Sequence, residues 1–218
     1  SCEYCNSFLS FFPTVAAILN IEADHLDFFK DLDDVERSFR RFADLVPEGG
    51  RIIANRDDEN TMRTLAGEER PVTTFGLAEG DVHAAGLTWE KGLPAFDVIY
   101  RGEVYAHVSL SVPGLHNVKN ALAAAASAIA LGVPGEAVSK GLAQFRGAGR
   151  RFEHKGTYNG AQVYDDYAHH PGELKALLDT ARTLGYDRVI CAFQPHTYTR
   201  TAALFDDFVE VLQKPDVT

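Results

Sequence analysis

The sequence predicts an α/β fold with a mostly parallel sheet and a small antiparallel side sheet. Over residues 14–75, short apolar runs that suit buried strands alternate with segments of helical periodicity. Residues 81–112 alternate apolar and polar side chains between glycine turns, which is typical of antiparallel strands. A further strand-and-helix region follows the small, flexible segment at residues 147–149.

The first region is predicted to alternate strands with helices. Residues 14–20 form a short apolar run that ends in a polar turn, which indicates a buried strand. Apolar side chains recur at helical spacing over residues 35–46, and Gly49-Gly50 ends that helix. Residues 51–55 and 72–75 are the next predicted strands, with a short helix between them.

The middle of the chain is predicted to hold the side sheet and two helices. Strands are expected within residues 96–100 and 104–112. The alanine-rich segment 117–131 predicts a helix that Gly132 ends, and Pro134 begins another that reaches about Phe145.

The glycines of residues 147–149 indicate a domain boundary between residues 1–148 and 149–218. After it we expect two strands joined near Asn159-Gly160, a helix from Pro171, a strand at residues 188–193 and a helix from about Arg200. So small a sheet is not expected to form a whole domain, and the chain is interpreted as an internal fragment.

Composition excludes several classes of protein. The net charge of −10 and the absence of a basic stripe argue against a nucleic-acid partner. No run approaches the ~20 apolar residues of a membrane span, no signal peptide is evident, and a cytoplasmic protein is expected. Cys2 and Cys5 form a C-x-x-C motif, but no second pair completes a zinc site.

Five polar segments occupy predicted strand ends and helix starts, where ligands bind in open α/β sheets. They are residues 20–27, 114–120, 147–153, 164–171 and 193–201. In the first, His25 lies among aspartates and could bind a metal; the alternative is a solvated acidic loop with a helix cap. Asn117 and Asn120 share a helix face and suit an adenine edge, unless they are only a helix cap and an exposed residue.

The other three segments suit anions or hydroxyl groups. Arg150 and Arg151 could clamp phosphate oxygens, or they could simply be solvated. Residues 164–171 carry paired aspartates and histidines, which suit metal ligation, general-base chemistry or ribose binding, and equally a helix cap with surface histidines. Residues 193–201 offer His196 and Arg200 at a helix start, where anions bind.

Taken in order, the motifs NIEADHLD, GLHNVKNALAAAA, GAGRRFE, DDYAHHP and FQPHTYTRT resemble the Mur ligases, and most closely their alanine-adding branch. The resemblance covers essentially the whole chain. It implies that residues 1–148 form the later part of a central ATP-binding domain and that residues 149–218 form the first half of a C-terminal Rossmann-like domain. The family's phosphate loop and one magnesium-binding glutamate would lie upstream, since residues 1–218 hold no G-x-x-x-x-G-K-[ST] motif.

The resemblance also implies roles for individual residues. His25 matches a metal-binding and catalytic histidine, and Arg151 matches a catalytic arginine that reaches the ATP phosphates. Asn117 and Asn120 match asparagines near ATP, and Asp166 matches an aspartate at the ribose. The residues that match the sugar-substrate and acyl-transfer surface are Tyr167, His169, His196 and Arg200.

The implied reaction is the ATP- and Mg²⁺-dependent ligation of L-alanine to UDP-N-acetylmuramate through an acyl phosphate, in peptidoglycan precursor synthesis. Several relatives use a carbamylated lysine, but the helix after Asp34 carries arginines and no lysine, which favours the alanine-adding branch. Thr197 stands where some members have a basic residue. No nucleic-acid or membrane partner is expected, and residues 1–218 alone are expected to be inactive without the phosphate loop.

Three alternatives remain open at this point. The nearest is the related ligase that attaches a recycled tripeptide to UDP-N-acetylmuramate. Another is a nucleotide-binding module without catalytic activity. The third is a metal hydrolase, which would need His25, His169 and His170 to converge on one ion.

Overall fold

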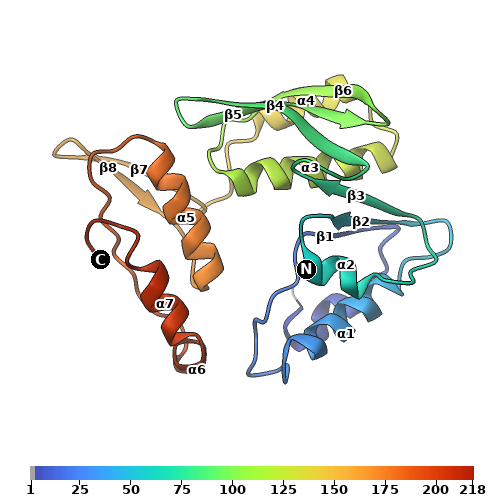
Figure 1. Ribbon diagram of the computed structural model, residues 1–218, viewed down its shortest axis with the longest axis horizontal. Coiled ribbons are helices and arrows are strands. Elements are labelled where there is room, and N and C mark those ends of the chain that lie inside the picture. The colour runs from blue at the N-terminus through green and yellow to red at the C-terminus, as the bar shows by residue number, and fades with distance from the viewer. Residues whose placement is uncertain (1–2) are drawn as a thin grey trace.

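The computed structural model describes residues 3–218 and contains one six-stranded mixed sheet and one two-stranded hairpin (Figure 1). The six strands lie in chain order: β1 Val15–Ile18, β2 Arg51–Asn55, β3 Val72–Gly76, β4 Val82–Glu90, β5 Leu93–Tyr100 and β6 Glu103–Ser109. Strands β1 to β4 pair in parallel, and β4, β5 and β6 pair antiparallel. The predicted α/β class is confirmed, and the antiparallel strands continue the parallel sheet through β4. Cys2 of the C-x-x-C motif lies outside the described residues.

Helices cover both faces of the parallel strands (Figure 1). Strand β2 shows why: Ile52 packs into the core beneath α1 (Leu32–Ala43), and Ile53 packs into the core beneath α3 (Leu115–Ala130). Successive side chains of a strand point to opposite faces, so a strand that is apolar throughout needs a cover on each side. The short helices η1 (Tyr4–Ser10) and α2 (Glu59–Thr64) lie on the α1 side.

Helix α1 begins at an aspartate and ends among arginines. The Asp31 side chain accepts the Asp34 N–H at 2.9 Å, and the last turn carries Arg40 and Arg41. Both features stabilise the helix, because they pair free backbone N–H groups and oppose the helix dipole. Only its boundaries differ from the prediction.

Helices α3 and α4 (Gly135–Gln144) pack against the antiparallel strands. The alanines of α3 let the helix approach the sheet closely, and Leu122 and Val118 are fully buried. The helix begins two residues earlier than predicted, at Leu115, with Gly114 as its N-cap. Among residues 3–218, no helix is both long enough and apolar enough to cross a membrane.

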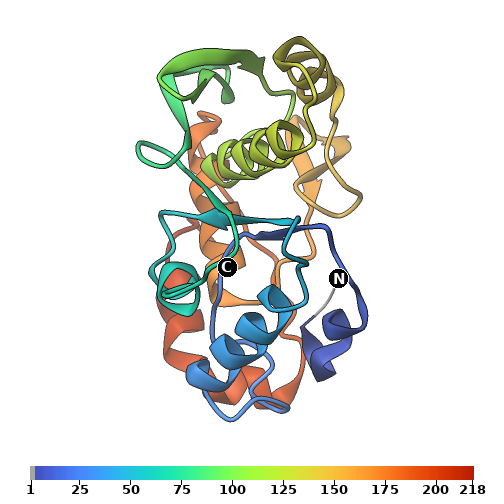
Figure 2. The ribbon, with the colours of Figure 1, turned by 90° about the vertical axis from the view of Figure 1, so that its right-hand side faces the viewer.

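The C-terminal region, residues 149–218, lies beside the first region (Figures 1 and 2). It contains the hairpin β7 Glu153–Tyr158 and β8 Ala161–Asp165, followed by helices α5 Pro171–Thr183, α6 Tyr198–Ala203 and α7 Phe205–Val211. The predicted hairpin and the helix from Pro171 are present, and α5 and α7 share a small core of their own. The single helix expected from about Arg200 is instead two short helices.

The strand predicted at residues 188–193 is wrong. Only Ile190 pairs, in an isolated parallel bridge with Val217, and its side chain is 67% exposed. Strand β8, the other candidate neighbour, pairs with β7 in the two-stranded sheet. A strand is defined by a row of hydrogen bonds to a neighbour, so an apolar segment without that row stays irregular.

Candidate functional site

His25 lies in the loop that follows β1, beside two carboxylates. Its Nε2 atom is 3.3 Å from Glu3 Oε1 and 3.7 Å from Asp24 Oδ2. The backbone of His25 is left-handed, with φ 54°, and its own N–H donates to Asp24 Oδ1 at 2.7 Å. A left-handed backbone is strained in a residue with a side chain and persists where surrounding contacts hold it. The loop therefore presents the imidazole to both carboxylates.

These three residues can hold a cation. One ligand atom from each of Glu3, Asp24 and His25 lies within 4.8 Å of the others, and all three residues are partly buried. Carboxylate oxygens suit Mg²⁺, which keeps several water ligands and binds phosphate oxygens. The imidazole is a softer donor and suits a place beside such a hydrated ion. The donor set fits a hydrated divalent cation held chiefly by the carboxylates.

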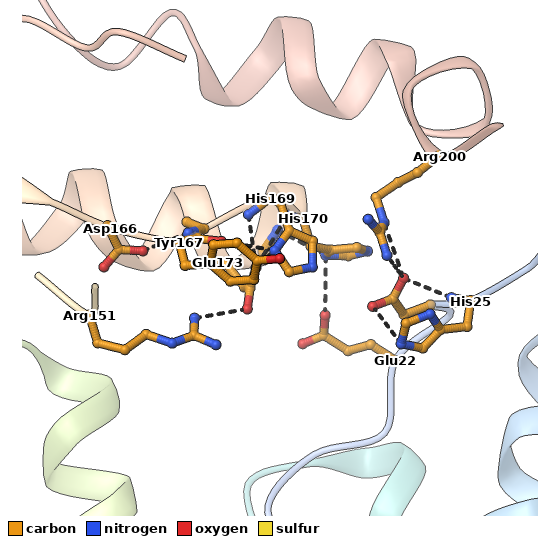
Figure 3. Close-up of polar contacts among 12 residues, drawn as sticks. Glu22, His25, Arg151, Asp166, Tyr167, His169, His170, Glu173 and Arg200 are labelled. Atoms are coloured by element: carbon orange, nitrogen blue, oxygen red, sulfur yellow. Dashed lines mark hydrogen bonds and ion pairs between the residues drawn. The ribbon is translucent and has the colours of Figure 1, made fainter. Parts of the chain in front are cut away.

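Arg200 reaches from α6 to the same loop (Figure 3). Its Nε and Nη2 atoms donate to Asp24 Oδ1 at 3.2 and 2.9 Å, and its side chain is only 12% exposed. Burial pushes the pKa of Asp24 up, but the N–H of His25 and the Arg200 guanidinium outweigh it, so the pKa lies below its usual range. Asp24 is therefore ionised at neutral pH, with one oxygen bound by Arg200 and the other facing His25.

Asp166 organises the turn between β8 and α5. Its Oδ2 atom accepts the Phe152 N–H at 2.6 Å, and its Oδ1 atom accepts the Ala168 N–H at 2.7 Å. Both carboxylate oxygens thus accept backbone N–H groups, which ties the segment around Phe152 to the turn before α5. Each oxygen keeps a further lone pair that could accept a hydroxyl.

Arg151 and His169 meet at one carboxylate, that of Glu173. Arg151 Nη1 donates to Glu173 Oε1 at 3.2 Å, and the His169 N–H donates to Glu173 Oε2 at 2.9 Å. The His169 Nδ1 atom is 2.8 Å from the Tyr167 carbonyl oxygen, a contact that requires a proton on Nδ1 and leaves Nε2 to accept in the neutral ring. The neighbouring Arg150 lies instead over the Tyr167 ring, 4.8 Å from its centre.

The two asparagines of α3 contact each other. Asn117 Nδ2 donates to the Pro113 carbonyl at 2.7 Å, and Asn120 Nδ2 is 3.4 Å from Asn117 Oδ1. Gly114 rather than Asn117 is the helix cap, so the simpler reading of Asn117 as an N-cap is wrong. Within residues 3–218, no hydrogen bond or ion pair joins either asparagine to Arg151 or Asp166. Burial lowers the pKa of the nearby His116. The negative charge of Asp166 opposes this shift, and the positive charge of Arg151 adds to it. The first turn of α3 therefore lies within electrostatic reach of both residues.

The remaining candidates for substrate binding, Tyr167, His169 and His196, lie close to one another in the C-terminal region. The ring centres of Tyr167 and His169 are 5.1 Å apart, and those of His169 and His196 are 6.1 Å apart. His170 Nδ1 is 3.6 Å from Glu22 Oε2, on the loop that carries His25 (Figure 3). The loop after β1 and the turn before α5 therefore face each other across the predicted boundary.

The histidines do not converge on one ion as a metal hydrolase would require. His170 Nδ1 accepts the Gly172 N–H in a capping box, and His169 Nδ1 points to the Tyr167 carbonyl. Within the described part of the chain, the group of possible metal ligands includes His25 and neither of these.

Several residues of this site were not predicted from sequence. Glu3 and Glu22 carry no signal that points to His25 or His170, since their contacts depend on the tertiary fold. Glu173 could have been found, because a glutamate three residues after a helix cap is the pattern of a capping box.

Comparison with known proteins identifies the family. The model of the Mur ligase middle domain matches residues 6–128, and the model of the Mur ligase glutamate ligase domain matches residues 150–218. The chain is 47% identical over 218 residues to UDP-N-acetylmuramate–L-alanine ligase of Caldanaerobacter subterraneus, covering 99% of this chain and 47% of that protein. It is 48% identical over 217 residues to the ligase of the same name from Clostridium perfringens, again covering 99% of this chain and 48% of that protein. The chain thus spans about half the length of these relatives.

Solved structures agree with the sequence comparison. The UDP-N-acetylmuramate-alanine ligase MurC of Thermotoga maritima superposes with a TM-score of 0.77 and 30% identity, covering 97% of this chain and 46% of that one. MurF of Acinetobacter baumannii superposes with a TM-score of 0.79 and 26% identity, covering 94% of this chain and 46% of that one. Since the middle-domain model alone matches more than half of its residues, the chain belongs to the Mur ligase family.

Proposed function

We propose that these residues are part of an ATP-dependent ligase that joins L-alanine to UDP-N-acetylmuramate, with a domain boundary between residues 148 and 149. The observation that carries the proposal is the meeting of Asp24 and Arg200. This contact brings the loop after β1, which carries the possible cation ligands, against the start of α6. The start of α6 resembles the family's substrate-binding surface. Identity of 47% to curated alanine-adding ligases runs through both regions and supports the same substrate pair.

The nucleotide would lie along the turn between β8 and α5. Arg151 has five N–H donors and, among residues 3–218, uses one on Glu173, which leaves the others to bind phosphate oxygens. Asp166 would accept a ribose hydroxyl. Asn120 is exposed at the first turns of α3 and would meet the adenine edge, with Asn117 holding its side chain.

Glu3, Asp24 and His25 are the described residues that would hold Mg²⁺. When bound, the ion supplies positive charge that neutralises phosphate oxygens. The chain's own contribution is to keep the Asp24 carboxylate ionised and close to the imidazole, which the Arg200 contact and the His25 N–H do.

The chemistry runs in two steps. The muramate carboxylate attacks the γ-phosphorus of ATP, which forms the acyl phosphate and releases ADP. The alanine amine then attacks the acyl carbon, and the tetrahedral intermediate collapses with loss of phosphate and a proton. Arg151, Arg200 and His196 would stabilise negative charge in these steps, while Tyr167 and His169 orient the sugar substrate.

The test is phosphate release by the full-length protein with magnesium-ATP. Release should require both UDP-N-acetylmuramate and L-alanine and should leave a product heavier than UDP-N-acetylmuramate by one alanyl residue. Turnover with the tripeptide L-alanyl-γ-D-glutamyl-diaminopimelate but not with alanine would overturn the alanine assignment and leave a peptide ligase in its place. No turnover with either amine would reject the ligase itself.

A further inference from the structure

Glu173 contacts two parts of the candidate site at once. Its Oε1 atom accepts from Arg151, and its Oε2 atom accepts the N–H groups of His169 and His170 at 2.9 and 3.3 Å. Arg151 matches the phosphate-facing position, and His169 matches the substrate-facing surface. One carboxylate therefore lies between the residue assigned to ATP and the residue assigned to the sugar substrate (Figure 3).

The carboxylate is held in place and in its ionised form. Glu173 is the third residue of α5 and completes a capping box with His170, so its own position is set by the helix. Burial pushes the pKa of Glu173 up, but the His169 N–H, the His169 imidazole and Arg151 outweigh it and bring it below the usual range. Arg151 itself is 52% exposed, and this ion pair is its only ion pair within residues 3–218.

We propose that Glu173 is a positioning residue that fixes the Arg151 guanidinium relative to the His169 turn. Its side chain contacts Arg151 and the His169 turn, and it acts on the nucleotide through Arg151. A long, exposed arginine side chain samples many rotamers. When one N–H group of its guanidinium is already bound by Glu173, the side chain loses less conformational entropy as phosphate binds. The inference rests on the proposed function in assigning phosphate to Arg151, but it concerns a residue to which that function assigns no role.

The substitution Glu173→Gln separates the anchor from the helix cap. The glutamine carbonyl can still accept the backbone N–H groups of His169 and His170, as glutamine does in natural capping boxes. The glutamine NH₂ group then faces Arg151. Because this group and the guanidinium are both hydrogen-bond donors, no hydrogen bond forms between them. The matched control is Glu136→Gln, in the exposed first turn of α4, where no hydrogen bond or ion pair to another described residue is found.

The experiment measures binding of a non-hydrolysable ATP analogue and of adenosine to the full-length protein by calorimetry. Glu173→Gln should weaken binding of the analogue about three- to tenfold, the cost of ordering one long side chain on binding, and leave adenosine binding within about twofold. In an Arg151→Ala background, Glu173→Gln should cause no further loss, because its effect passes through the arginine. Glu136→Gln should change neither ligand.

Three results would overturn the proposal. Equal weakening of adenosine and the analogue would indicate a structural role for Glu173. The same loss in the Arg151→Ala background would show that the two residues act independently. Tighter analogue binding by Glu173→Gln would show that Glu173 competes with phosphate for Arg151. Normal nucleotide binding without alanine-dependent turnover would instead reject the proposed function and leave the Glu173 result standing.

Discussion

Asp24 and Arg200 are 176 positions apart in the chain, and both Nε and Nη2 of the arginine donate to one oxygen of the aspartate. The same oxygen accepts the His25 N–H, and the other oxygen faces the His25 ring. Whatever binds beside His25 is therefore coupled to Arg200 through a shared carboxylate. This pair connects the loop after β1 to the C-terminal region.

Replacing Arg200 by alanine in the full-length protein should lower kcat/KM for UDP-N-acetylmuramate by at least about tenfold, because the variant loses a partly buried charge pair. The loop at residues 20–27 should also exchange its amide hydrogens faster, which hydrogen-exchange mass spectrometry measures. Arg182→Ala is the control, since Arg182 pairs with Asp216 within the C-terminal region. Equal effects of the two substitutions would show that the Asp24 contact has no special role.

His25→Ala should reduce ligation by at least about 100-fold and leave the melting temperature nearly unchanged, since it removes a group beside a proposed metal site. Alanine at position 25 should keep the left-handed backbone of the loop. It removes the imidazole that lies beside the Glu3 carboxylate. Steady-state rates across a magnesium titration test the prediction, with His107→Ala on the exposed face of β6 as the control. Near-normal turnover at saturating magnesium would remove His25 from the cation site.

Arg151→Ala should cost more activity than Arg150→Ala. The loss of a charge-assisted contact at a transferring phosphoryl group is worth about 2–4 kcal/mol of transition-state stabilisation. Arg150 instead lies over the Tyr167 ring and pairs with Asp165, so its loss should mainly affect local packing. Comparison of kcat/KM for the two variants decides this, and equal losses or the reverse order would contradict the assignment of Arg151.

Glu68 should make stability depend on pH. Its side chain is 1% exposed and lies between Arg70 and Arg40, at 2.9 and 3.3 Å. Burial pushes the pKa of Glu68 up, but the Arg70 N–H and the two guanidinium groups outweigh it and hold the pKa below its usual range. A lowered carboxyl pKa stabilises the fold above the unfolded pKa, and this stability is lost as pH falls toward the folded pKa.

Glu68→Gln should therefore lower the free energy of unfolding by about 1–3 kcal/mol at pH 7, since two partly buried guanidinium groups lose their partner. The difference from wild type should shrink below about pH 4.3, the ordinary pKa of glutamate. Urea unfolding of the full-length protein at several pH values measures it. Glu136→Gln, on an exposed helix end, should show no such dependence.

The local patterns of the chain predicted most of its elements. The run at residues 14–20 became β1, the alanine-rich segment became α3, and Asn159-Gly160 joined a hairpin. In each case neighbouring residues set the outcome, through side-chain periodicity, helix propensity or turn geometry. Residues 188–193 had an equally apolar pattern and failed to form a strand, because strand pairing requires a partner that local sequence does not supply.

The candidate site divides in the same way. The chain alone placed His25, Arg151 and Arg200 in polar segments at strand and helix ends, and its ordered motifs identified the family. Only the tertiary structure decided that Asp24 would bind Arg200, that Glu3 would lie beside His25 and that Glu173 would hold Arg151. These contacts join residues far apart in the chain, and no local preference of helix, strand or turn encodes them. They arise when packing brings distant segments together, as when α6 meets the loop after β1 and the partly buried Asp24 and Arg200 become partners.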